Sequence, residues 1–390
     1  MCYADDTLAI SRGKTYHEAV VRATAGVAQI VRQIRGLGLT VALEKSEAMC
    51  FHRPRNPPPP GLEIVVGGIQ IKVTPSMTYL GLVLDGRWTF REHFKQLQTK
   101  VSKSAGALAS LLPNLGGPSL SCRRLYLGVV RSMAMYGAPI WADRLRKENS
   151  LALGRLQRVM AIRAVRGYRT ISKDAACLLA GAIPWDLDAR ALADVFWRCA
   201  AVRAGGSNPL PDAVRRWRSD ARDMAIDLWQ ERLEEPQASV DLVLAIRPVL
   251  RQWLDRKDGT LSFRLTQVLT GHGCFGRYLC EIVGREETPR CHHCDEDRDT
   301  TEHTVSVCPS WNGQRAALTA AIGYDTSLPA LVRSMLGSNQ GWRAVEDFAE
   351  HVMAAKEEAE RIREREALDP RRRSRPRRRR VNNDDRNVPP

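Results

Sequence analysis

The chain has 390 residues, of which 44% are hydrophobic and 26% charged, and its formal net charge is +15. That length can bury two or three hydrophobic cores, and a strongly basic balance indicates a polyanionic partner. No apolar run is long enough to span a bilayer and no secretory signal is visible, so we expect an intracellular protein, nuclear or cytoplasmic, without a membrane partner. The ten cysteines lack the dense spacing of a secreted scaffold, which predicts reduced thiols apart from any metal ligands.

A Tyr-x-Asp-Asp tetrad occupies residues 3–6 and is flanked on both sides by β-prone residues. This pattern predicts a strand-turn-strand hairpin that carries the adjacent carboxylates of Asp5 and Asp6. Paired carboxylates suit a two-metal phosphoryl-transfer site, because Mg²⁺ prefers carboxylate oxygens and substrate phosphates. The alternative is an ordinary acidic β-turn, since Asp is favoured in turns.

The next elements alternate between helix and short strands. Helical spacing begins at Tyr16 and stops at Gly36 and Gly38. Beyond the helix we expect β-prone segments at 41–43 and 48–51 around an exposed turn with Lys45, a surface proline tract at 56–61, a hairpin of 64–66 and 69–71 turning at Gly67-Gly68, and a strand at 79–85.

In their order and spacing, these segments resemble the palm of a reverse transcriptase. The sequence is similar to the Pol proteins of non-LTR, LINE-type retrotransposons, most of all the type-1 elements of insect ribosomal DNA. The resemblance implies that Asp5 and Asp6 hold the Mg²⁺ pair and that Lys45 neutralises or protonates the leaving pyrophosphate. It also implies that Tyr79, Leu80 and Gly81 grip the primer end.

The same resemblance implies an RNA-directed DNA polymerase that acts by target-primed reverse transcription. Its partners would be an RNA template, a DNA target that supplies the primer, and deoxynucleoside triphosphates, with an endonuclease domain upstream. A complete palm adds a third aspartate and fingers before the hairpin, which these residues lack. We therefore expect the C-terminal part of a polyprotein that is inactive alone. The alternative is a non-catalytic nucleic-acid-binding remnant that uses a zinc knuckle and a basic tail.

Helical periodicity dominates from Trp88 onward. Between Trp88 and Arg144, an apolar stripe of Phe90, Phe94, Leu97 and Val101 predicts thumb-like helices, with lysines at polar positions. Those lysines, at positions 95, 100 and 103, either face phosphates or merely solvate the helix. Further helices are expected at 156–165, 175–179, 191–202, 214–229 and 240–254, and their tryptophans are expected in the core.

Cys291, Cys294, His303 and Cys308 have the spacing C-x2-C-x8-H-x4-C. Three thiolates and one imidazole supply a complete tetrahedral shell for structural Zn²⁺, with no open position for catalysis. Free cysteines in a loop are the weaker alternative, because the segment is short and polar. Among the three nearby histidines His303 is the expected ligand, since His292 and His293 lie where the backbone turns. We expect His272 and Cys274 in a glycine-flanked turn against the knuckle. The resembling family uses this knuckle to bind nucleic acid, which nearby arginines at positions 277, 285 and 290 would suit.

A long helix is predicted from Trp342 to Leu368, with a Glu357–Arg361 pair at i,i+4 spacing. Nine arginines and two aspartates follow in residues 371–390. This tail should be disordered and seek phosphates, and a nuclear-targeting signal or a solvated tail is also compatible. The expected phosphate-binding residues are Arg371, Arg372, Arg373, Arg377, Arg378, Arg379 and Arg380.

Together these patterns predict an α+β fold in which a partial palm precedes mostly helical parts. The expected organisation is a partial palm at 1–86, thumb-like helices at 87–148, a helical domain at 149–265, a CCHC zinc knuckle region at 266–312, a helical segment at 313–368 and the arginine-rich tail at 369–390.

Overall fold

A computed structural model describes residues 2–368 except 116, 119 and 258. The chain forms two compact units. The first comprises Met1–Ala164 and Ser172–Pro236, and the second comprises Val165–Ile171 and Gln237–Pro390. Helices predominate in both units, and all the described strands lie within the first 85 residues, which agrees with the expected α+β class.

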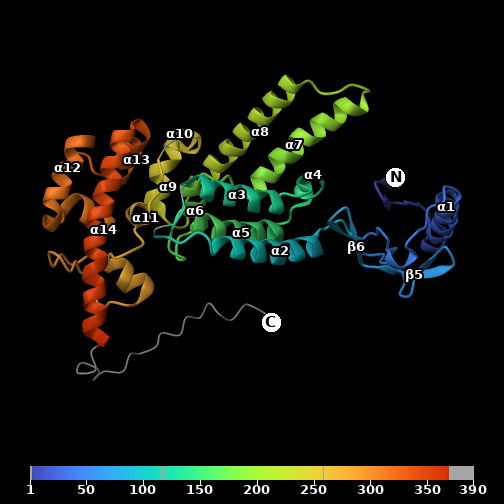
Figure 1. Cartoon of the computed structure of the whole chain (residues 1–390), viewed down its shortest axis with the longest axis horizontal. Helices are drawn as coiled ribbons and strands as arrows, with labels where there is room; N and C mark the ends of the chain where they lie inside the picture. The colour runs from blue at the N-terminus through green and yellow to red at the C-terminus, as the bar shows by residue number, and fades with distance from the viewer. Residues whose placement is uncertain (1, 116, 119, 258, 369–390) are drawn as a thin grey trace. The chain divides into compact units, whose positions relative to one another are not determined.

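The N-terminal part of the first unit contains three small sheets (Figure 1). Strand β5 pairs antiparallel with β4 and parallel with β3, while β1–β2 and β6–β7 are separate antiparallel hairpins. The strands are β1 (Cys2–Tyr3), β2 (Asp6–Thr7), β3 (Ala48–Met49), β4 (Glu63–Val66), β5 (Ile69–Thr74), β6 (Ser76–Tyr79) and β7 (Leu82–Asp85). Helix α1 (Tyr16–Gly36), capped by the Thr15 hydroxyl, packs against β4.

Several expectations for this part are confirmed. Helix α1 has the predicted bounds, and Val66 pairs with Ile69 across the Gly67-Gly68 turn. Both glycines have positive φ, at 58° and 92°, as a two-residue hairpin turn of this kind requires.

Two strand predictions are wrong. The segment expected as β at 41–43 forms no strand, because Leu43 begins the 3₁₀ turn η1 (Leu43–Lys45), in which the Lys45 and Ser46 amides bond back to Ala42 and Leu43. Lys45 itself lies exposed on this turn, as expected. The predicted strand at 79–85 is interrupted at its start. Leu80 and Gly81, with φ of 46° and 76°, form the turn between β6 and β7, and the Tyr136 hydroxyl donates to the Leu80 carbonyl at 2.7 Å.

The rest of the first unit is helical, and three of its helices, α2, α3 and α5, pack side by side (Figure 1). The expected stripe on α2 is buried: Phe90 and Val101 are 1% and 0% exposed, and Phe94 meets Trp141 edge-on at 5.1 Å. Helices α7 and α8 form an antiparallel hairpin. The elements are α2 (Arg91–Ala109), α3 (Leu120–Ala134), α4 (Ala138–Trp141), η2 (Ala142–Arg144), α5 (Lys147–Ala164), α6 (Lys173–Ala180), α7 (Trp185–Ala204) and α8 (Pro211–Arg232).

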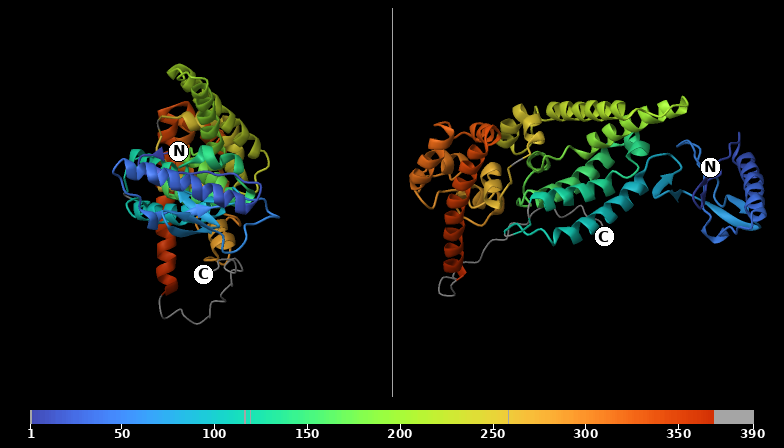
Figure 2. Two further views of the ribbon diagram at one scale, coloured as in Figure 1. Left: turned by 90° about the vertical axis from the view of Figure 1, so that its right-hand side faces the viewer. Right: turned by 45° about the horizontal axis from the view of Figure 1, so that its top comes forward.

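The second unit is built around α14 (Asn339–Leu368), which packs against α11, α12 and α13 (Figures 1 and 2). The expected Glu357–Arg361 pair is present at 4.0 Å. The helix buries an apolar stripe of Val345, Phe348, Ala349, Val352 and Met353. The preceding elements are α9 (Val240–Ile246), η3 (Arg247–Val249), α10 (Leu250–Asp255), α11 (Phe263–Thr270), η4 (Tyr278–Val283), η5 (His303–Val307), η6 (Pro309–Trp311), α12 (Asn312–Ile322) and α13 (Leu328–Gly337).

Two further expectations about the helices need correction. The continuous helix predicted at 240–254 is broken by the 3₁₀ segment η3, because Pro248 lacks an amide donor for the helical ladder. Trp197, expected in the core, is 48% exposed, and its indole nitrogen donates to the Pro139 carbonyl at 3.0 Å. By contrast, Trp229 and Trp253 are 1% and 0% exposed, as predicted.

Candidate metal centre

Three cysteines and one histidine of the second unit converge on one point. The ligand atoms of Cys291, Cys294, His303 and Cys308 all lie within 4.8 Å of one another. The Sγ atoms of Cys291 and Cys308 are 4.0 Å apart, and Cys294 Sγ lies 3.3 Å from His303 Nε2. These are the four residues selected by spacing, so the structure brings the whole predicted ligand set together.

The geometry of the cluster fits a tetrahedral ion. Zn–S bonds of about 2.3 Å at tetrahedral angles place two sulfurs about 3.8 Å apart, close to the separation of the Cys291 and Cys308 sulfurs. The nearby backbone amides of His293 and Cys294 act to lower the pKa of Cys291, and that of Ser310 acts to lower the pKa of Cys308, against the larger effect of burial. Such amide donors stabilise thiolates, so the backbone around the cluster is arranged for anionic ligands.

Local backbone bonds explain why the ligands meet. The Cys291 amide donates to the Glu296 carbonyl at 2.8 Å, and the Asp295 amide donates back to Cys291 at 2.9 Å. Asp295 has a φ of 61°, which turns the chain after the first two cysteines. On the other side, the Cys308 amide donates to the His303 carbonyl at 2.8 Å across the π-helical turn η5.

Burial favours the neutral forms of Cys291, His303 and Cys308. Cys291 and Cys308 are both 0% exposed. Burial raises the pKa of the Cys291 thiol to about 12, raises the pKa of Cys308, and lowers the pKa of His303. A bound divalent ion stabilises the thiolates that burial disfavours. The thiols therefore lose their protons when the metal binds. Affinity for the ion therefore decreases as the pH falls.

The other histidines and the nearby cysteine have different partners. His292 Nε2 lies 3.5 Å from a Glu286 oxygen, and the His293 ring packs 4.8 Å from the Trp311 ring. Burial lowers the pKa of His293 to about 4, so its imidazole is neutral. The Cys274 thiol donates to Glu360 at 2.8 Å. None of these residues belongs to the four-residue cluster.

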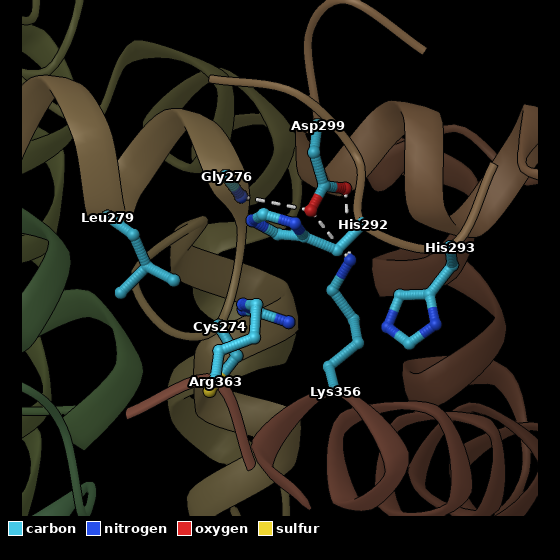
Figure 3. A pocket seen from close by; sticks show the side chains of 8 residues that line it. All are labelled: Cys274, Gly276, Leu279, His292, His293, Asp299, Lys356 and Arg363. Atoms are coloured by element: carbon cyan, nitrogen blue, oxygen red, sulfur yellow. Dashed lines mark hydrogen bonds and ion pairs between the residues drawn. The ribbon is translucent and has the colours of Figure 1, made fainter. Parts of the chain in front are cut away.

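Asp299 and Lys356, which the sequence analysis did not select, form a buried ion pair beside the metal ligands. Lys356 Nζ lies 3.0 and 2.8 Å from the two carboxylate oxygens of Asp299, and the side chains are 2% and 3% exposed. Figure 3 shows the lysine amine pointing to the carboxylate in a pocket that is also lined by Gly276, His292 and His293. A sequence signal did exist for Lys356, because it continues the Val345, Ala349 and Val352 stripe of α14.

The arginines around the metal centre are engaged with carboxylates. Arg277 pairs with Glu281, Arg285 with Glu360 and Glu364, and Arg290 with Asp297. Residues 266–312 contain four arginines and no lysine, against eight aspartates and glutamates. The local charge is therefore negative, which opposes phosphate binding at this element.

The predicted palm residues lie in the first unit. Cys2 pairs with Thr7 and Tyr3 with Asp6, so the tetrad forms a hairpin whose turn is Ala4-Asp5. Asp5, Asp6 and Lys45 are exposed. Within residues 2–368, apart from the three gaps, Asp5 and Asp6 belong to no cluster of three or more metal-ligating groups. Tyr79 ends β6, and Leu80 and Gly81 form the following turn. The seven tail arginines expected to bind phosphates, Arg371 to Arg373 and Arg377 to Arg380, lie outside the described residues.

No helix in the described part of the chain is long and apolar enough to cross a membrane. No family model matches the chain, and no solved structure matches it.

Curated relatives do match. A Pol polyprotein from a type-1 retrotransposable element R1 of Bradysia coprophila is 27% identical over 267 residues, which is 65% of this chain and 26% of that protein. The Pol polyprotein from element R1 4 of Nasonia vitripennis is 24% identical over 395 residues, covering 92% of this chain and 96% of the relative. A probable RNA-directed DNA polymerase from transposon X-element of Drosophila melanogaster is 25% identical over 140 residues, 36% of this chain and 15% of that protein.

At 22–28% identity, these relatives support a distant similarity of the chain to the Pol polyproteins of non-LTR retrotransposons. Within that class, the similarity is to R1 elements, and a further R1 polyprotein of Nasonia vitripennis is 22% identical over 86% of this chain. The chain spans about a quarter of the length of the Bradysia coprophila polyprotein.

Proposed function

We propose that this chain holds nucleic acid for RNA-directed DNA synthesis by a retrotransposon Pol polyprotein, and that α2, α3 and α5 form the contact surface. The distribution of charge carries this proposal. Residues 87–164, which include these helices and which we call the basic bundle, contain 14 lysines and arginines against three aspartates and glutamates. The tail at 371–390 adds nine arginines against two aspartates, so the remaining residues have 36 cations and 39 anions. The positive charge thus lies in two segments.

Several cations of the basic bundle lie at its surface. Lys95, Lys100 and Lys103 are all exposed on α2, on the side away from its buried stripe. Only three carboxylates lie within the bundle, of which Glu148 pairs with Arg91 at 3.0 Å, so the bundle keeps a large positive excess. Lysines that project from a rigid helix can contact successive phosphates of a duplex without reading its sequence.

Replacing Lys95, Lys100 and Lys103 together with Gln should weaken binding to an RNA–DNA hybrid. Each lost phosphate contact reduces the counterion release, so the salt slope of log affinity should become shallower by about 2 to 3. Fluorescence anisotropy over a series of salt concentrations measures both effects. The triple replacement of Arg215, Arg216 and Arg218 on α8 removes the same charge outside the bundle. Equal weakening by the two triple variants would contradict the placement of the binding surface.

Catalysis is the second candidate function, and the hairpin geometry favours it. The β1–β2 hairpin presents two adjacent, exposed carboxylates, which can supply two of the ligands that a pair of Mg²⁺ ions needs at the primer end. In this proposal Asp5 and Asp6 bind magnesium, Lys45 neutralises pyrophosphate, and Tyr79, Leu80 and Gly81 position the primer. The reaction is target-primed reverse transcription from deoxynucleoside triphosphates, within a polyprotein that also supplies an endonuclease.

Asp5→Asn and Asp6→Asn should each abolish DNA synthesis in a Pol protein that contains this chain. Each amide removes one negative ligand from the magnesium pair, whereas hybrid binding by the basic bundle should persist. Primer extension on an RNA template, run beside a binding assay, separates the two effects. Glu44→Gln, at an exposed carboxylate next to Lys45, serves as the control. Full synthesis by both aspartate variants would refute the palm assignment and leave the binding proposal intact.

For the metal centre we propose structural Zn²⁺, because three thiolates and one imidazole in a closed shell suit zinc and provide no open position. Its acidic surroundings favour a role in holding the second unit together over direct phosphate contact. The arginine-rich tail then supplies a second, independent set of phosphate contacts.

A further inference from the structure

Asp299, near the metal centre, makes hydrogen bonds through its amide, its carbonyl and its carboxylate. Its amide donates to the Pro289 carbonyl at 2.7 Å, and its own carbonyl accepts from the Arg277 amide at 3.1 Å. Its carboxylate accepts from the Gly276 amide at 2.9 Å, in addition to the pair with Lys356. The Asp299 side chain is 3% exposed, so these bonds replace the hydration that the carboxylate loses on burial.

On one side, Asp299 is tied to both halves of the ligand set. Pro289, whose carbonyl it binds, precedes Cys291 by two positions. The Thr304 hydroxyl, directly after His303, donates to the Asp299 carboxylate at 3.0 Å. An ion that joins Cys291 to His303 therefore also fixes the two segments from which Asp299 takes its bonds.

On the other side, Asp299 holds the loop 271–278. The Gly276 and Arg277 amides that it binds lead directly into Tyr278. Only glycine can occupy position 276, because a Cβ there would lie 2.2 Å from the Arg290 carbonyl oxygen. The loop thus packs closely against Arg290, which directly precedes the ligand Cys291.

The loop 271–278, together with Thr266 of α11, in turn contacts residues 165–171, which are distant in sequence. The Thr170 hydroxyl lies 2.9 Å from His272 Nδ1 and 2.7 Å from the Tyr278 hydroxyl. The Tyr168 ring packs 5.7 Å from Tyr278, and the Thr266 hydroxyl donates to the Val165 carbonyl at 2.7 Å. In sequence, however, residues 165–171 connect α5 with α6, which both belong to the first unit.

We propose that Asp299 is a positioning residue through which an occupied metal centre holds residues 165–171 in the second unit. With the ion bound, the metal ligands keep Pro289 and Thr304 in place, Asp299 stays oriented, and the loop 271–278 stays ready to bind Thr170. Without the ion, the two ligand segments separate, and the loop loses the carboxylate that accepts from Gly276. Metal occupancy thereby controls the connection between α5 of the basic bundle and α6. This coupling does not depend on what the bundle binds.

Hydrogen–deuterium exchange of the whole chain, with zinc and after chelation, tests the coupling. In the wild-type chain, peptides covering 165–171 should exchange at least tenfold faster after chelation, whereas the middle of α5 should be unchanged. Residues 165–171 should exchange fast in Asp299→Asn even with one zinc bound. Asp297→Asn, at an exposed carboxylate two positions before Asp299, should behave as wild type. Metal-independent protection in the wild type, or metal-dependent protection that survives in Asp299→Asn, overturns the proposal.

Thr170→Val keeps the proposal testable if Asp299→Asn fails to fold. This variant removes the contacts with His272 and Tyr278 but leaves Asp299 and the metal ligands untouched. With zinc bound, it should exchange fast at 165–171 while 271–278 keeps its metal-dependent protection. Unchanged exchange at 165–171 in Thr170→Val would show that the loop does not hold the segment, and the proposal would fail.

Discussion

Native mass spectrometry should find one zinc ion per chain, and Cys291→Ser or Cys308→Ser should remove it. Both sulfurs are 0% exposed in the cluster, so a serine leaves the ion without a thiolate ligand and the loop without its cross-link. Structural zinc in small peptides supplies about 10–16 kcal/mol of apparent binding free energy at neutral pH. Residues near 285–312 should therefore unfold in these variants, as they should on chelation, while the helices of the first unit keep their circular dichroism signal.

Two controls make this result specific to the ligand set. Cys280→Ser removes a thiol of the adjacent π-helical turn η4 that lies outside the cluster, and His292→Ala removes an imidazole whose nearest acidic partner is Glu286. Both variants should keep the zinc, whereas His303→Ala should lose it or bind it far more weakly. Zinc lost with His292 and retained without His303, or a zinc-free wild-type chain, would contradict the assignment.

The features that could be predicted from the sequence are those determined by neighbours along the chain. The Gly67-Gly68 hairpin, the bounds of α1 and the buried stripes of α2 and α14 follow from turn chemistry and helical period. The metal ligands could also be predicted from the sequence. Both pairs of ligands are close in sequence, and C-x2-C and H-x4-C spacings bring donors together in single turns.

The features that could not be predicted depend on distant contacts or on backbone angles. The position of the turn at Leu80-Gly81 involves Tyr136, which lies 56 residues away. The Asp299–Lys356 pair joins residues 57 positions apart, and neither an aspartate in an acidic loop nor a lysine in a charged helix stands out alone. The capture of residues 165–171 likewise joins Thr170 to a residue 108 positions away. Patterns of spacing between neighbouring residues do not predict contacts between residues so far apart in the chain.

Lys356→Met should strongly destabilise the second unit. It leaves the Asp299 carboxylate buried without its counter-charge, and breaking one partner of a buried pair costs about 3–5 kcal/mol. Denaturant unfolding, followed by tryptophan fluorescence and by exchange in α14, measures the loss. Arg290→Gln breaks the exposed pair with Asp297 and should cost at most about 1 kcal/mol.

The double variant Lys356→Met with Asp299→Asn separates the cost of an unpaired charge from the value of the pair. Without the carboxylate no buried charge remains, so the double variant should regain most of the free energy of unfolding that Lys356→Met loses. It should nevertheless exchange fast at residues 165–171, because a side-chain amide at position 299 has one acceptor oxygen where the carboxylate has two, and no lysine holds it in orientation. A Lys356→Met variant no less stable than Arg290→Gln would mean that the Asp299 carboxylate finds another cation or a proton, and that the pair does not stabilise the metal-bearing unit.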